Sequence, residues 1–178
     1  MEDNSLYNRY ALAFLEVAKK EKKVEEYRKE IIELKDFFKN EPDFVRVLKL
    51  TDIPKEKRYG IIEKVFKNFS EDSRNYLKIM IKNNRAYFIY KILKETLFRF
   101  DDYLEIEEGT LFSSFEMNSQ QIETIKKAVE KNVNRRVELK LVIDPNLIGG
   151  FVVSLKNDIF DASMLTKING LKASLIKD

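Results

Sequence analysis

The chain has 178 residues, of which 44% are hydrophobic and 35% are charged, a balance that favours a folded core over disorder. It contains neither Cys nor His, which removes disulfides, thiolate nucleophiles, Cys-based zinc sites and the commonest general base. The formal net charge is only +3, with 23 basic and 19 acidic side chains in residues 1–104 and 10 against 11 in residues 105–178. Neither part has the basic excess of a nucleic-acid-binding protein.

Amphipathic spacing with a period of 3.6 predicts six helices in residues 1–104. They are expected over residues 4–20, 22–38, 42–50, 51–69, 70–82 and 86–104. Asn4 or Ser5 is predicted to cap the first helix, and Ser70, with Ser73 as the alternative, to cap the fifth. Successive amphipathic helices with short joints indicate an antiparallel six-helix bundle.

The composition changes at residues 105–109, and segments with a period of two follow. Strands are predicted over residues 110–117, 137–143, 151–155 and 159–161, and helices over residues 118–133 and from residue 164. Asn118 with Gln121 predicts a capping box, and Asn157-Asp158 predicts a two-residue hairpin turn. We therefore expect a mostly α protein, with a helical domain over residues 1–104 and a small α/β domain over residues 105–178.

The first helix carries two adjacent apolar stripes, which together are wider than a usual core-facing stripe of about 100°. The stripes consist of Leu6, Tyr10, Ala13 and Val17, and of Tyr7, Ala11, Phe14 and Ala18. Either the helix lies deep in the bundle, or one stripe faces the core and the other faces a partner.

The fifth helix repeats this surplus of apolar surface. Tyr76, Ile79 and Asn83 form a stripe beside the more core-like Leu77 and Ile81. If the two helices are neighbours, their stripes form a groove for another amphipathic helix. The predicted groove residues are Leu6, Tyr10, Ala13, Phe14, Val17, Tyr76, Ile79, Met80 and Asn83. The alternative is that these residues are fully buried in the bundle.

No pattern in the chain predicts a catalytic or metal site. Gly149-Gly150 lacks the Gly-Lys-Ser/Thr sequence of a phosphate loop, and the following segment is a predicted strand. Asp144, Asp158 and Asp161 are interpreted as turn and strand-end residues rather than as Mg²⁺ ligands. No cofactor is expected. The start of the chain lacks a signal peptide, and no apolar run reaches the ~20 residues that span a bilayer.

A signature lies near the end of the chain. It consists of Pro145, Leu147, Ile148, Gly149 and Gly150, then Asp161 and Ser163, then the helical positions Leu165, Ile168, Leu171 and Leu175. With residues 9–14 (Arg-Tyr-Ala-Leu-Ala-Phe), this signature resembles the delta subunit of ATP synthase, called the oligomycin-sensitivity-conferring protein in mitochondria. The resemblance covers essentially the whole chain.

The resemblance implies a non-catalytic stator subunit of a bacterial-type rotary ATP synthase. Its N-terminal domain would grip the N-terminal helices of alpha subunits on the catalytic head, and its C-terminal part would engage the peripheral stalk of b subunits. Ion flow and ATP synthesis would thereby stay coupled. The expected location is the cytoplasmic face of the bacterial cell membrane, with membrane contact only through partners and no contact with nucleic acid.

The signature departs from the family at two places. Ala162 stands where Gly is usual, and Met164, Leu165 and Thr166 largely replace the usual basic residues, of which Lys167 remains with Lys172. This argues against a charge-based stalk contact in this segment. Two other classes of protein are alternatives: a basic RNA-binding or ribosome-associated protein, and an enzyme that uses carboxylates. The aromatic residues of the N-terminal half sit at core spacing beside acids, which disfavours base stacking.

Overall fold

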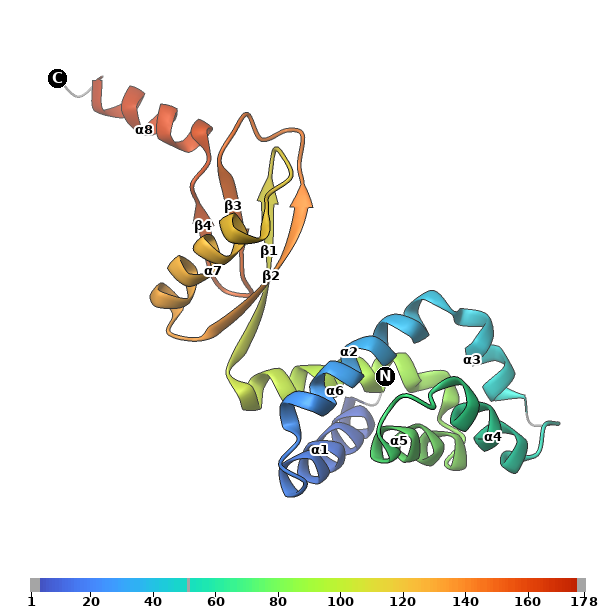
Figure 1. Ribbon diagram of the computed structural model, residues 1–178. Coiled ribbons are helices and arrows are strands. Elements are labelled where there is room, and N and C mark those ends of the chain that lie inside the picture. Colours follow the sequence, from blue (N-terminus) through green and yellow to red (C-terminus); the bar gives the residue numbers. More distant parts are fainter. Residues whose placement is uncertain (1–3, 51, 176–178) are drawn as a thin grey trace. The chain divides into compact units, whose positions relative to one another are not determined.

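The computed structural model describes residues 4–50 and 52–175, without the side chains of residue 4 and residues 170–175. The chain divides into two compact units, Met1–Asp101 and Asp102–Asp178. The first unit contains helices and the second contains a small sheet with helices, so the fold is mostly helical with a C-terminal mixed sheet, as predicted (Figure 1).

The helices before the sheet are α1 (Asn4–Lys20), α2 (Val24–Asn40), α3 (Pro42–Lys49), α4 (Lys55–Val65), α5 (Glu71–Lys82), the 3₁₀ helix η1 (Ala86–Phe88) and α6 (Ile89–Leu104). Their apolar faces form one core. Phe14, Tyr27, Tyr76 and Phe100 gather in one part of it, and the rings of Phe37, Phe38, Phe44 and Phe66 in another.

Helix ends in this unit are fixed by backbone geometry that the sequence shows only in part. Lys22 has a φ of 56°, its N–H donates to the Lys19 carbonyl, and the Lys23 N–H donates to the Ala18 carbonyl. This Schellman arrangement ends α1 and delays the start of α2 to Val24, two residues after the predicted start. The two predicted caps, Asn4 and Ser5, are both inside α1, and the residue before the helix lies outside the described residues.

Three further boundaries in the helical part differ from the prediction. Helix α4 begins at Lys55, after Pro54, and ends at Val65, because Phe66 leaves helical geometry and packs against Phe37. The predicted start at Thr51 lies outside the described residues. The predicted helix over residues 86–104 is interrupted, since residues 86–88 form η1 before α6 begins.

A buried ion pair joins α2 to α6. The Arg28 Nε donates to the Asp101 Oδ1 over 2.5 Å, and both side chains are almost fully buried. Removing one partner of such a pair leaves the other charged and buried, which is strongly destabilising.

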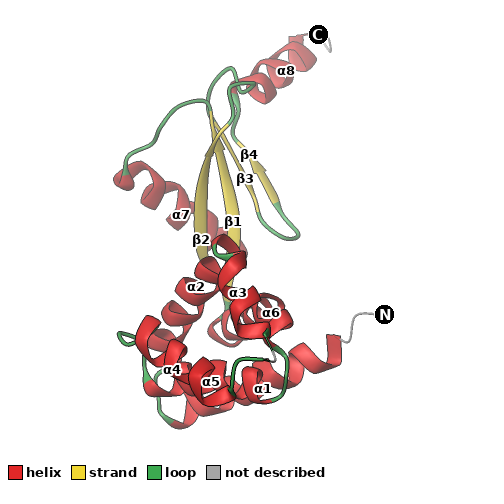
Figure 2. Ribbon diagram, turned by 90° about the vertical axis from the view of Figure 1, so that its right-hand side faces the viewer, coloured by secondary structure: helices red, strands yellow, loops and turns green. Residues whose placement is uncertain are grey.

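The second unit consists of β1 (Ile106–Ser113), α7 (Ser119–Val133), β2 (Arg136–Ile143), β3 (Phe151–Ser154), β4 (Ile159–Asp161) and α8 (Met164–Leu175). The strand order is β2-β1-β3-β4, with β1 parallel to β2 and the other pairs antiparallel. Figure 2 shows the strands side by side with α7 next to them, and the core between α7 and the sheet includes Leu111, Val129, Val137 and Val153.

Two elements of this unit are displaced from their predicted positions. Strand β1 begins at Ile106 instead of residue 110 and ends at Ser113, because its parallel pairing with β2 starts where Ile106 meets Arg136. The hairpin turn is centred on Lys156 and Asn157, one residue earlier than predicted, and the Leu155 N–H donates to the Asp158 carbonyl across it. The capping box of Asn118 and Gln121 is confirmed.

Candidate functional site

Helix α1 buries one of its apolar stripes and leaves much of the other accessible. Tyr7, Ala11, Phe14 and Ala18 are all buried in the core. On the neighbouring stripe, Leu6 is buried, Tyr10 is half-buried, and Ala13 and Val17 are exposed. The apolar surface on this helix is therefore wider than the part that the other helices of the unit cover.

Helix α5 also carries both buried and exposed apolar side chains, and three consecutive residues show this. The Ile79 side chain is 48% exposed, whereas Met80 and Ile81 are fully buried. Tyr76 is buried, and Asn83 at the end of the stripe is exposed. The helix starts at a cap built by Ser70, whose Oγ accepts from the Ser73 N–H, so the predicted cap is confirmed.

Phe14 and Tyr76 hold α1 and α5 together. Their rings stack with centroids 4.3 Å apart. The Tyr76 hydroxyl is hydrogen-bonded to the Thr96 Oγ1 at 2.8 Å, and that Oγ1 itself donates to the Ile92 carbonyl. Because the Thr96 hydroxyl hydrogen is used in that second bond, the Tyr76 hydroxyl is the donor to Thr96. Burial raises the pKa of the Tyr76 phenol.

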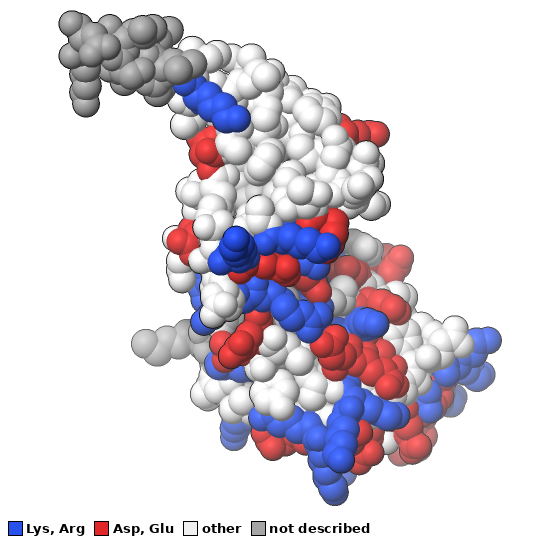
Figure 3. All heavy atoms as spheres, turned by 60° about the vertical axis from the view of Figure 1, so that its left-hand side comes forward, with Lys and Arg blue, Asp and Glu red and all other residues white. Residues whose placement is uncertain are grey.

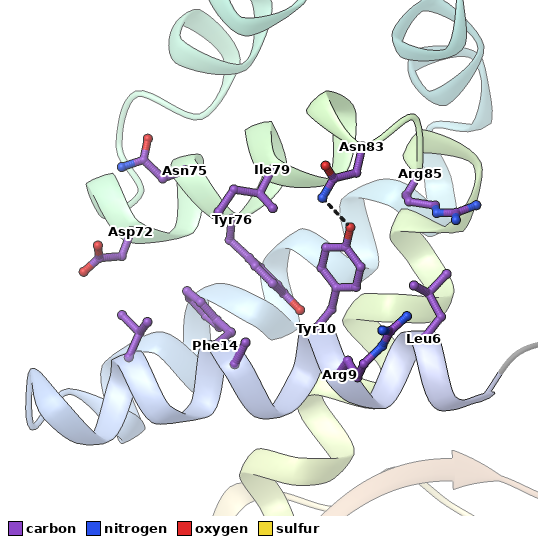
Figure 4. A pocket seen from close by; sticks show the side chains of 12 residues that line it. Leu6, Arg9, Tyr10, Phe14, Asp72, Asn75, Tyr76, Ile79, Asn83 and Arg85 are labelled. Carbon is purple, nitrogen blue, oxygen red and sulfur yellow. Dashed lines mark hydrogen bonds between the residues drawn. The ribbon is translucent and has the colours of Figure 1, made fainter.

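A groove of about 610 Å³ runs between the two helices (Figure 4). We call it the α1–α5 groove. It is lined by Leu6, Arg9, Tyr10, Ala13, Phe14, Val17, Asp72, Asn75, Tyr76, Ile79, Asn83 and Arg85. Eight of the nine residues predicted from the sequence are among them. Met80 is not, because its side chain is fully buried in the core.

The four lining residues that the prediction missed are polar or charged. Asp72 and Asn75 lie four residues before Tyr76 and Ile79, so helical spacing alone could have included them. Arg85 lies beyond the end of α5. It is placed by a second Schellman turn, in which Asn84 has a φ of 56° and the Arg85 N–H donates to the Met80 carbonyl.

Polar groups on the groove are held by specific bonds. The Asn83 Nδ2 donates to the Tyr10 hydroxyl over 2.8 Å and bridges the two walls (Figure 4). The Asp72 Oδ2 accepts from the Tyr27 hydroxyl over 2.6 Å. Burial and this carboxylate raise the pKa of Tyr27, so the phenol keeps the proton that it donates.

The C-terminal signature has a structural explanation. Gly150 has a φ of 80°, and a Cβ on it would lie 2.4 Å from the Ala162 carbonyl oxygen. On either side of this contact, the Ala162 N–H donates to the Phe151 carbonyl and the Met164 N–H to the Gly149 carbonyl. Gly150 is required where the chain entering β3 passes against the chain leaving β4.

Asp161, at the end of β4, and Ser163, directly before α8, form a bonded group at the start of the last helix. The Asp161 carboxylate accepts from the Ser163 N–H over 2.8 Å and from the Thr166 hydroxyl over 2.7 Å. These bonds, the one from the Ser163 backbone above all, hold the pKa of Asp161 below its ordinary value of 3.8. On the other side of the signature, Pro145 lies in the turn after β2, the Leu147 N–H closes this turn by donating to the Asp144 carbonyl, and Ile148 is 72% exposed.

The described residues contain no cluster of three or more acidic side chains that could hold a metal ion. In the same part of the chain, every helix is too short or too polar to cross a bilayer. Figure 3 shows Lys and Arg interleaved with Asp and Glu over the first unit, without a basic patch on that face.

The family model described as the ATP synthase delta (OSCP) subunit matches residues 6–175. The chain belongs to this family. The match covers both units, including the α1–α5 groove and the signature. Members of the family are peripheral-stalk subunits of ATP synthase, so the chain is a stator subunit. The family and the interleaved charges both favour this assignment over an RNA-binding protein.

Individual relatives agree with the assignment. The chain is 33% identical to ATP synthase subunit delta of Mycoplasma capricolum over 175 residues, covering 97% of each chain. It is 32% identical to that of Mycoplasma mobile over 169 residues, covering 94% of each. Its fold matches a chain in the cryo-EM structure of the Toxoplasma gondii mitochondrial ATP synthase hexamer, with a TM-score of 0.65, 17% identity, and 96% and 97% of the two chains covered.

Proposed function

We propose that the α1–α5 groove binds an N-terminal helix of an alpha subunit on the catalytic head. The observation that carries this proposal is the half-exposed Ile79 beside the buried Met80 and Ile81. An apolar side chain at that position is not buried in the core, but it lines the same groove as Val17, which is 39% exposed. Grooves of this kind bind the apolar face of an amphipathic helix.

Ala13 adds a geometric argument. It is exposed on the groove wall between the larger Tyr10 and Val17, so it leaves room for a helix backbone to approach α1 closely. The floor below it is made by the Phe14 and Tyr76 rings, which are already stacked and buried. A guest helix therefore meets a floor that does not need to rearrange, which lowers the cost of binding.

The second unit is proposed to engage the end of the b-subunit stalk. Met164, Leu165 and Ile168 on α8 are 54%, 51% and 44% exposed, and the family's basic residues are largely replaced in this segment. A contact here would bury apolar surface rather than pair charges. The side chains of Leu171 and Leu175, which the sequence placed on the same helical face, lie outside the described residues.

The proposed role is mechanical and not catalytic. The six α-helices of residues 1–104 act as one antiparallel bundle that holds the head, and residues 105–178 form the domain that holds the stalk. Together they resist rotor torque, so that ion flow stays coupled to ATP synthesis at the cytoplasmic face of the bacterial membrane. The chain contacts the membrane through partners alone and uses no cofactor.

Membrane vesicles that carry the ATP synthase without this subunit provide the test. Pumping is measured with a fluorescent gradient probe, and ATP hydrolysis is measured in the same vesicles. Adding the chain back should raise the amount of ATP-driven ion pumping per ATP hydrolysed. The Ile79→Arg variant should restore less pumping at equal concentration. Equal pumping by the variant would contradict the groove, and full pumping without any added chain would contradict the stator role.

A further inference from the structure

The two ends of the α1–α5 groove carry opposite charges. Figure 4 shows Arg9 and Arg85 at one end and Asp72, with Asn75, at the other. Among the described residues, no ion pair is found for Arg9 or Arg85. The Asp72 carboxylate is held in place by the Tyr27 hydroxyl. The apolar floor thus lies between two cationic groups and one anionic group.

The length of the groove sets the length of its guest. On α1 the lining residues run from Leu6 to Val17, and on α5 they run from Asp72 to Asn83. Each wall is about 17 Å long, since a helix rises 1.5 Å per residue. A guest helix of roughly three turns fills this length, and its terminal turns then lie beside the charged ends.

We propose that the groove selects a guest helix with acidic side chains in its first turn and basic side chains in its last. This inference rests on the proposed function, and adds a direction to it. Acidic first turns and basic last turns are the arrangement that stabilises a helix against its own dipole. In such a guest, the first turn lies at Arg9 and Arg85 and the last turn lies at Asp72.

The direction follows from the order of the labelled residues. Helix α1 runs from Arg9 towards Phe14, at the Asp72 end, and α5 runs from Asp72 towards Asn83 (Figure 4). The guest therefore runs in the same direction as α1 and opposite to α5. Its dipole alone would favour the reverse direction, but a helix end carries about half a charge, which is less than the full charges of its side chains.

Two synthetic peptides test this with the full-length protein. Both span roughly three helical turns and have the same apolar face. The first carries Glu in its first turn and Lys in its last, and the second has these charges exchanged. By titration calorimetry, the first peptide should bind about three- to tenfold more tightly, as expected for exposed charge pairs. A nitroxide on its N-terminus should broaden amide signals near Arg85 more strongly than those near Asp72.

Charge reversal supplies the matched control. Arg9→Glu with Arg85→Glu should remove or invert the preference between the two peptides. Lys29→Glu with Lys39→Glu changes the net charge equally at exposed positions of α2 outside the groove, and should preserve it. Equal affinities for both peptides, or stronger broadening near Asp72 than near Arg85, would overturn the charge selection but leave the groove standing. If neither peptide shifts the amide signals of Val17 and Ile79, the groove itself is wrong as well.

Discussion

The ring of Tyr76 stacks on the ring of Phe14 at 4.3 Å, with 10° between the ring planes, while its hydroxyl is bonded to Thr96 on α6. One side chain thus joins three helices and forms part of the groove floor. Its apolar and polar contacts can be removed separately, because Phe keeps the ring and loses only the hydroxyl.

The variant Tyr76→Phe is therefore expected to lose one buried hydrogen bond and little packing. We expect the free energy of unfolding to fall by about 0.5–1.5 kcal/mol, measured by urea denaturation. The Thr96 hydroxyl keeps its bond to Ile92, which limits the loss. Tyr76→Ala should cost about 3–5 kcal/mol, since it also empties the site of the ring. Equal losses for the two variants would show that the ring stack contributes nothing.

Gly150 and Gly60 should respond in opposite ways to replacement by alanine. Gly150→Ala forces a side chain into a positive φ and against the Ala162 carbonyl, and should destabilise the second unit by at least ~2 kcal/mol. Gly60 lies inside α4, and a Cβ on it would meet no atom within 4 Å outside the neighbouring backbone of its own helix, so Gly60→Ala should gain about 0.5–1 kcal/mol. Hydrogen exchange of the β3 and α4 amides measures each effect locally. A tolerated Gly150→Ala would disprove the close approach.

The pH dependence of the second unit should contain a contribution from Asp161. Its pKa in the folded chain lies below 3.8, so the stability it contributes is full above that value and is lost as the pH falls through the depressed pKa. Nuclear magnetic resonance titration of the carboxyl should give a midpoint below 3.8. In the unchanged protein, the amides at the start of α8 should lose protection from exchange as the pH falls through the pKa of Asp161. This loss should be smaller in Asp161→Asn and unchanged in Asp158→Asn. An ordinary midpoint for Asp161 would argue against the bonds from Ser163 and Thr166.

A fragment of residues 1–104 is expected to fold alone. It retains the complete set of apolar helical faces and the Arg28–Asp101 ion pair, which lies within the first unit. Circular dichroism should show a cooperative thermal transition. A fragment that binds a hydrophobic dye and melts without a sharp transition would place the domain boundary elsewhere.

The sequence predicted most of the groove because helical periodicity records which side chains share a face. The spacing of apolar residues alone shows two stripes on α1, and the folded chain buries one of them. Periodicity could not decide whether the Met80 side chain is buried, since Met80 lies between the core face and the surface face of its helix. It also could not find Arg85, whose position depends on the left-handed conformation of Asn84.

Features that depend on distant residues were the least predictable. Arg28 and Asp101 are 73 residues apart, and nothing in the local pattern of either helix indicates that they pair. The start of β1 was missed because Glu107 and Glu108 are unusual in a strand, and parallel pairing with β2 overrides their low propensity. The Asn118 cap and the Ser70 cap were predicted, since their chemistry is local.

The proposed function depends on the α1–α5 groove binding an alpha-subunit helix. Variants at two adjacent residues of α5 test this binding most directly. Ile79→Arg places a charge at a half-exposed position, so the thermal melt should stay nearly unchanged. Binding of an alpha-subunit N-terminal peptide, measured by calorimetry, should weaken by ~2–4 kcal/mol, as at an interface hot spot. Met80→Arg is the control, because it buries an unpaired charge and should unfold the first unit. Loss of folding in Ile79→Arg, or peptide binding equal to that of the unchanged protein, would contradict the account.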